Sequence, residues 1–181
     1  MLQPLSRGAS VLAAIAVGLT ACGAASAAKP ASTPSGPPAS RPPACVAAGP
    51  NRIAPNSWSQ ARSQLAPTGA SAIRLCRYAG LNGHPPRSLV RAALVTSRTT
   101  VASLVQAFDR LPAGTGTFSC PVDDGSAVVA LLSYPHGRVL TISVGLRGCQ
   151  VVTNGDLRRT ASGTNGQPGP ALVSRLERLT S

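Results

Sequence analysis

A proline-rich segment limits how much of this chain can pack into a folded domain. Residues 23–44 read GAASAAKPASTPSGPPASRPPA, with six prolines among alanine and serine. Such a segment buries too little apolar surface to fold and favours an extended, polyproline-like chain, which could reach roughly 70 Å at about 3.1 Å per residue. The sequence therefore predicts a tether ending at residue 44, followed by a single domain over residues 45–181, whose 137 residues can bury one core.

Residues 1–21 have the features of an export signal. Arg7 precedes an apolar run from Gly8 to Leu19, which is too short for a stable transmembrane helix. Leu19-Thr20-Ala21-Cys22 follows, an aliphatic residue and two small residues before a cysteine. These features resemble the signal peptide and lipobox of bacterial lipoproteins.

The resemblance implies that Cys22 carries a diacylglycerol, with fatty acids such as palmitate, and that residues 1–21 are removed. The mature chain would then be anchored through its lipid to the outer, extracytoplasmic face of the cell membrane, with residues 22–44 as the tether. Ala25-Ser26-Ala27 leaves a second interpretation open, because it matches the small-x-small site of ordinary signal peptidase. Cleavage there would release a secreted, diffusible protein.

Hydrophobic periodicity predicts the elements of the domain. Residues 138–146 alternate apolar with small or polar side chains, which is typical of a strand with one buried face. Residues 100–111 carry an apolar stripe at helical spacing. Residues 88–96 fit a helix or a strand, and their valine and threonine favour a strand. The expected strands are 72–78, 88–96, 126–134, 138–146 and 150–154, and the expected helices are 100–111 and 170–179.

In chain order these elements read β-β-α-β-β-β-α. This order predicts an α+β fold, a small antiparallel sheet with two amphipathic helices packed on it and stabilised by disulfides. The turn residues Pro135-His136-Gly137 predict a hairpin between residues 126–134 and 138–146. If the hairpin turns at His136-Gly137, the residue numbers of any two residues that lie opposite each other sum to about 273.

Four cysteines fall in the domain. An even number in an exported chain implies disulfides, with three possible pairings. Their spacing matches no zinc-binding pattern. The predicted hairpin register brings Cys149 close to Cys120, provided that the chain bends at Pro121, and Cys45 then pairs with Cys76 by elimination.

Few residues are candidates for catalysis. The motifs of nucleotide-binding loops, serine hydrolases and zinc proteases do not occur in the sequence. Asp123-Asp124-Gly125 could bind a cation or do acid/base work, but Asp-Gly before an apolar strand is typical of a tight turn. His84 and His136 lie among proline and glycine in predicted turns. The sequence therefore nominates no catalytic residue, no cofactor and no metal site, and an enzyme is the less favoured interpretation.

The net charge is strongly positive. The chain has 17 lysines and arginines against 5 acids, and the domain holds 14 of its arginines and no lysine. Arginine binds phosphate and carboxylate through its planar fork. We expect Arg74, Arg77, Arg158 and Arg159 to form a polyanion-binding face, to which Arg87, Arg91 and Arg98 could add.

Outside the membrane, the available anions are lipid headgroups, wall polymers and acidic envelope proteins. We expect no nucleic-acid partner, because nucleic acid is not among these anions and because aromatic residues, only 3% of the chain, offer no stacking platform for single strands. A composition rich in alanine, glycine, proline and arginine is also typical of a GC-rich genome. In that interpretation the arginines only confer solubility.

These observations favour a membrane-tethered, non-catalytic binding module at the cell envelope. Its partner would be an anionic envelope polymer or an envelope protein. Two other functions remain open, a secreted or surface hydrolase with a site that the sequence does not reveal, and a diffusible inhibitor or effector.

Overall fold

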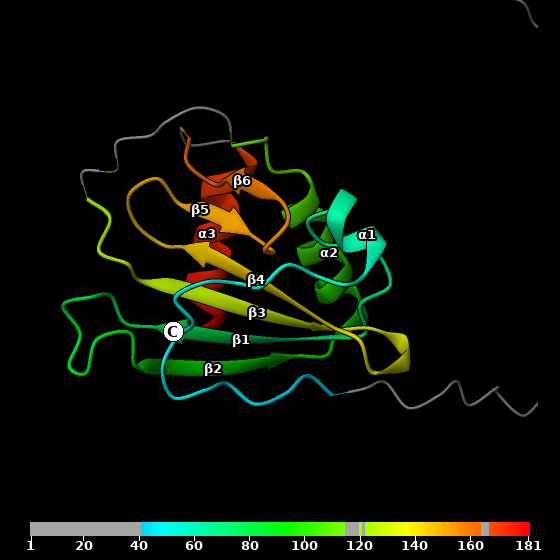
Figure 1. The fold of residues 1–181 in the computed structure, drawn as a ribbon, viewed down its shortest axis with the longest axis horizontal. Coiled ribbons are helices and arrows are strands. Elements are labelled where there is room, and N and C mark those ends of the chain that lie inside the picture. The colour runs from blue at the N-terminus through cyan, green and yellow to red at the C-terminus, as the bar shows by residue number, and fades with distance from the viewer. Residues whose placement is uncertain (1–40, 115–119, 121, 164–166) are drawn as a thin grey trace, which may run out of the picture. The chain divides into compact units, whose positions relative to one another are not determined.

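A six-stranded antiparallel sheet organises the chain (Figure 1). The computed structural model describes residues 41–114, 120, 122–163 and 167–181. The strands lie side by side in the order β2-β1-β3-β4-β5-β6. The elements are α1 (Ser59–Ser63), β1 (Ala72–Tyr78), β2 (Leu89–Val95), α2 (Arg98–Asp109), β3 (Ala127–Ser133), the 3-10 turn η1 (Pro135–Gly137), β4 (Val139–Gly145), β5 (Val151–Thr153), β6 (Arg158–Thr160) and α3 (Pro168–Leu179).

The α+β prediction is confirmed, and residues 89–95 form a strand. Two elements were missed. The α1 helix is a single turn of mostly polar residues, and β6 is three residues long with two arginines, so neither carries a periodic apolar signal. Strand β6 forms because it pairs with β5, Val152 lying opposite Arg159.

The β3–β4 hairpin is shifted by one residue from the expected register. Ser133 lies opposite Val139, so paired numbers sum to 272. Pro135 has no N–H with which to close a two-residue turn, and the N–H of Tyr134 instead donates to the carbonyl of Arg138 at 2.9 Å. The turn therefore contains three residues and places His136 and Gly137 at φ of 62° and 71°.

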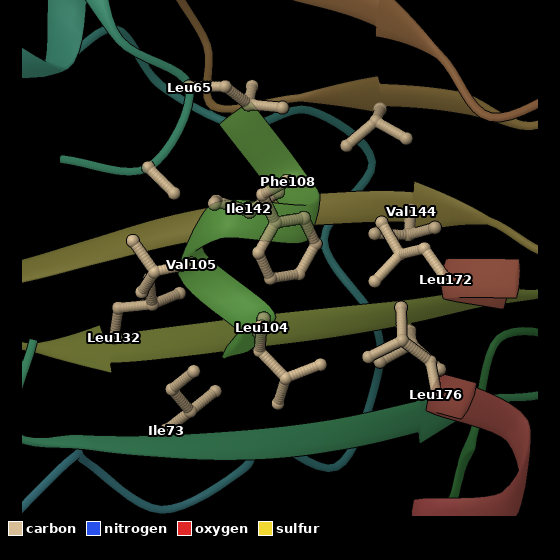
Figure 2. Packing of buried hydrophobic residues seen from close by; sticks show 14 of the residues in the cluster. Leu65, Ile73, Leu104, Val105, Phe108, Leu132, Ile142, Val144, Leu172 and Leu176 are labelled. Atoms are coloured by element: carbon tan, nitrogen blue, oxygen red, sulfur yellow. The ribbon is translucent and has the colours of Figure 1, made fainter. Parts of the chain in front are cut away.

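The main core lies between the sheet and the helices α2 and α3, which Figure 1 shows behind the sheet. Helix α2 begins where the side chain of Ser97 accepts the N–H of Thr100, and Pro112 follows its end. Figure 2 shows the fully buried ring of Phe108 at the centre of this layer. The residues around it come from both helices and the central strands, among them Ile73, Leu104, Leu132, Ile142, Leu172 and Leu176.

The opposite face of the sheet is covered by an irregular segment, residues 41–58, which crosses in front of the strands in Figure 1. Here a small cluster of Cys76, Tyr78 and Val129 packs with Cys45. Backbone hydrogen bonds join residues 47 and 49 to residues 89 and 87. A side chain at Gly49 would meet the Tyr78 ring at 2.8 Å, so only glycine allows this close approach.

Both predicted disulfides are present. Cys45 is bonded to Cys76 and Cys120 to Cys149. The first joins the irregular segment to β1, and the second joins the chain before β3 to the connection between β4 and β5. Two disulfides are compatible with an extracytoplasmic location. Within the described ranges, no helix has the length and apolar character needed to cross a membrane.

Candidate functional site

A groove of about 1270 Å³ runs along α2. One wall is a face of that helix, and the other is the loop of residues 66–71 that leads into β1. Leu94 and Thr96, at the end of β2, close one side. Arg41, the first described residue, also lines the groove, so the chain enters the domain beside it.

The groove is open because its walls carry small side chains. Ala66, Ala70 and Ala72 line one wall, and Ala102 lies opposite on α2. At Gly69, a side chain would find no atom within 4 Å. Larger residues at these positions would fill the space between the loop and the helix.

Helical spacing explains how α2 serves both the core and the groove. Its apolar stripe of Val101, Leu104, Val105 and Phe108 is buried. The neighbouring face, set one to two positions away along the helix, lines the groove with Arg98, Ala102, Gln106, Asp109 and Arg110. Arg98 is the first residue of α2 and Arg110 directly follows its last, so both arginines line the groove at opposite ends of the helix, turned by about 120° from each other around its axis.

Three hydrogen-bonded contacts hold the loop wall in place. Asp109 Oδ1 accepts the N–H of Leu65 at 3.0 Å. Tyr134 Oη donates to the carbonyl of Pro67 at 2.7 Å. The N–H of Ser71 donates to the carbonyl of Ser133 at 2.8 Å. Burial, with Asp109 nearby, raises the pKa of Tyr134, so its hydroxyl stays protonated and keeps donating.

The groove is electropositive. Arg41, Arg98 and Arg110 are all exposed on its walls. Asp109 is the one acid among the described lining residues, and the bond from Leu65 already occupies one of its oxygens. A groove of apolar and small polar groups with cations at both ends can hold an anion that also carries apolar surface.

The four arginines predicted to form a polyanion-binding face do not share one. Arg74 pairs across to Leu131 on the outer face of the sheet, whereas Arg77 pairs with Val128 of the main core and therefore points to the helix side. Arg158 and Arg159 are adjacent in β6 and so also point to opposite faces.

The two pairs are also far apart. Strands β3, β4 and β5 lie between β1 and β6, which separates them by about 19 Å at the usual strand spacing.

The Nε atoms of Arg74 and Arg159 are buried without a hydrogen-bond partner among the described residues.

The carboxylates have structural partners. Asp123 accepts the N–H of Gly125 at 2.9 Å and Asp124 that of Ser126 at 2.8 Å, which makes the Asp-Asp-Gly sequence a turn. The bonds from Ser126 lower the pKa of Asp124. The other acids bond as follows: Asp109 with Leu65, Asp156 with Asn56, and Glu177 with Arg147 at 3.6 Å.

The remaining candidates do not assemble into a reactive site. His84 and His136 are exposed in separate turns. The described residues contain no group of three or more His, Cys, Asp or Glu side chains able to hold a metal ion. A second, smaller cavity of about 230 Å³ is lined by two arginines and two acids, so its charges balance: Arg77, Arg147, Asp124 and Glu177.

Sequence reasoning named Arg98 but missed Arg110, Arg41 and the groove itself. The series Arg98, Ala102, Gln106 and Arg110 at four-residue intervals beside the apolar stripe was the available signal. The opposing loop wall comes from distant positions and carries no pattern of its own.

Comparison with known proteins adds no relative: no protein-family model matches the chain, and neither does any curated sequence or solved structure.

Proposed function

We propose that this chain is an extracytoplasmic, membrane-tethered binding module that holds an anionic partner in the α2 groove. The lipobox at Leu19–Cys22 and the proline-rich tether support the location, and two disulfides are compatible with it. The domain as a whole has an excess of arginine, and in this proposal the arginines that line the groove bind the partner.

One observation carries the proposal. The groove has an exposed arginine at each end of α2 and a third at Arg41, against the single carboxylate of Asp109 in its described lining. Hydrogen bonds with Asp109, Tyr134 and Ser133 hold its loop wall, so little ordering entropy is lost when a partner binds. The proposal is for binding without catalysis, because the described lining residues include no histidine or cysteine.

The test uses the purified full chain in nonionic detergent and poly-L-glutamate as the probe. We expect calorimetry to show binding that weakens as salt rises from 50 to 200 mM. An Arg98→Gln/Arg110→Gln double variant should bind about fivefold to tenfold more weakly, since two exposed ion pairs contribute up to about 1 kcal/mol each.

The matched control is Arg52→Gln/Arg158→Gln, which removes the same charge from two exposed positions outside the groove lining. It should change the affinity by less than twofold. Equal losses in the two double variants would show that net charge alone attracts the probe, and the proposal would be wrong.

Mass spectrometry tests the tether separately. We expect the native chain to begin at Cys22 with added acyl mass, and its four remaining cysteines to alkylate only after reduction. A chain that begins near Ala28 without lipid would instead support a diffusible protein.

A further inference from the structure

The partner of the groove must bring its own anion. No aspartate or glutamate precedes Asp109, so the residues before Arg41 cannot supply a carboxylate to the groove. A second copy is a poor source too, because its acids are either adjacent, as Asp123 and Asp124 are, or at least 14 positions apart, so no short segment of it offers two separated carboxylates. Charge complementarity therefore points to a different molecule.

The spacing of the two arginines indicates the shape of that molecule. Arg98 begins α2 and Arg110 caps its end twelve positions later, which places their backbones about 18 Å apart along the helix axis at 1.5 Å per residue. The apolar lining between them is Ala102 and Val105 on α2 with Leu94 beside them, and Ser103 and Gln106 add uncharged polar groups. A ligand that uses both arginines thus has two anionic groups separated by apolar surface.

An extended peptide has this form. At about 3.3 Å per residue, five or six residues span the distance between the arginines. A wall polymer with regularly spaced phosphates would leave the apolar lining without a match. An acyl chain has at most one anionic end and would leave one of the two arginines unpaired.

We infer that the groove binds an extended acidic segment of an envelope protein, with two acidic residues five or six positions apart and small apolar residues between them. This inference rests on the proposed function, because it names the partner of the same groove. One acidic side chain pairs with Arg98 and the other with Arg110, and the apolar side chains lie against Ala102 and Val105.

The experiment measures fluorescence anisotropy of labelled peptides on the full chain. Each peptide has two glutamates separated by one, three, five or seven alanine and leucine residues. We expect the five-residue spacer to bind two- to fivefold more tightly than the one-residue spacer. Arg98→Gln and Arg110→Gln should each abolish this preference, and Arg158→Gln should keep it.

A second variant tests the apolar part of the site. Ala102→Leu places a larger side chain in the groove, and the matched Ala171→Leu changes an exposed alanine of α3 outside the described groove lining. Only Ala102→Leu should weaken the five-residue spacer, by at least threefold, with the melting temperatures of both variants unchanged.

The outcomes separate the two proposals. Binding that depends on Arg98 and Arg110 but not on spacer length overturns the inference and leaves the proposed function standing. If phosphatidylglycerol vesicles bind through the same arginines and no peptide does, the inference is also overturned, in favour of lipid. If neither poly-L-glutamate nor any peptide is sensitive to these arginines, both proposals fail.

Discussion

On one face of the sheet, α2 and α3 bury a continuous apolar layer centred on Phe108, and neither of the two disulfides includes a residue of these helices. On the other face, residues 41–58 have no regular structure, and the apolar cluster beneath them has only three buried members. That face depends on the Cys45–Cys76 disulfide and on a few backbone hydrogen bonds. The comparison shows two ways of covering a sheet, by buried area and by cross-linking.

The largest effect is expected on the helix side. Phe108→Ala removes a fully buried ring from the centre of the core and should lower the free energy of unfolding by about 3–5 kcal/mol. Urea denaturation followed by circular dichroism measures the loss. A loss under about 1 kcal/mol would mean that the helix layer is not the main source of stability.

Removing the Cys45–Cys76 disulfide tests the face that residues 41–58 cover. The bond closes a loop with a sequence separation of 31, so Cys45→Ala/Cys76→Ala should cost about 3–4 kcal/mol by chain entropy. Amide exchange should speed up at Gly49 and Leu89, whose N–H groups bond across this segment, and stay slow in α2.

The control is Cys120→Ala/Cys149→Ala, with a sequence separation of 29. It should cost a similar free energy without faster exchange at Gly49 and Leu89. Equal exchange in both variants would contradict the local role of the Cys45–Cys76 bond.

Two tyrosines give a matched comparison of the faces. Tyr134→Phe leaves the carbonyl of Pro67 without its buried hydrogen bond and should cost about 1–3 kcal/mol. Tyr78→Phe loses a part-buried bond of 3.1 Å to the carbonyl of Val46 and should cost about 0.5–1.5 kcal/mol. Thermal melts rank the two, and the reverse order would show that the outer segment is the more tightly held.

The smallest effect is a pH dependence at the turn before β3. The pKa of Asp124 is lower in the folded chain than the ordinary 3.8, so its stabilisation is complete above that value and is lost as the pH falls through the folded pKa. Asp124→Asn should therefore reduce stability slightly at pH 7 and show a shallower decline between pH 4 and pH 2. Unfolding curves measured across that range give the free energy of unfolding at each pH. If it fell equally steeply with pH in both proteins, the prediction would be wrong.

The sequence was informative where periodicity reports burial. Alternation in residues 138–146 and the stripe from Val101 to Leu111 predicted β4 and α2, because the residues that set each pattern face the core, among them Leu140, Ile142 and Val144 on β4 and Leu104 and Phe108 on α2. The Cys120–Cys149 pairing was accessible for the same reason, through the hairpin that brings both ends together.

The site was less accessible, because it is made by long-range neighbours. The sequence analysis grouped Arg74 with Arg77, and Arg158 with Arg159, because they are close in the sequence. Side chains alternate between the two faces of a strand, however, and this places the members of each pair on opposite faces. The strand order that separates β1 from β6, and the loop that faces α2, carry no local signal.

The position of the Cys45–Cys76 bond also determines how the domain bears a mechanical load. A pull on the chain from the N-terminal side of Cys45 passes through the disulfide directly into β1. That strand is paired along its length with β2 on one side and β3 on the other, so the force must shear two ladders of hydrogen bonds at once. The loop wall of the groove, residues 66–71, lies outside the path of that force, whereas Arg41 and Ala72 of the groove lining lie in it. A pull from the N-terminal side therefore acts on Arg41 and β1 first and reaches the loop wall only through its hydrogen bonds to the rest of the domain.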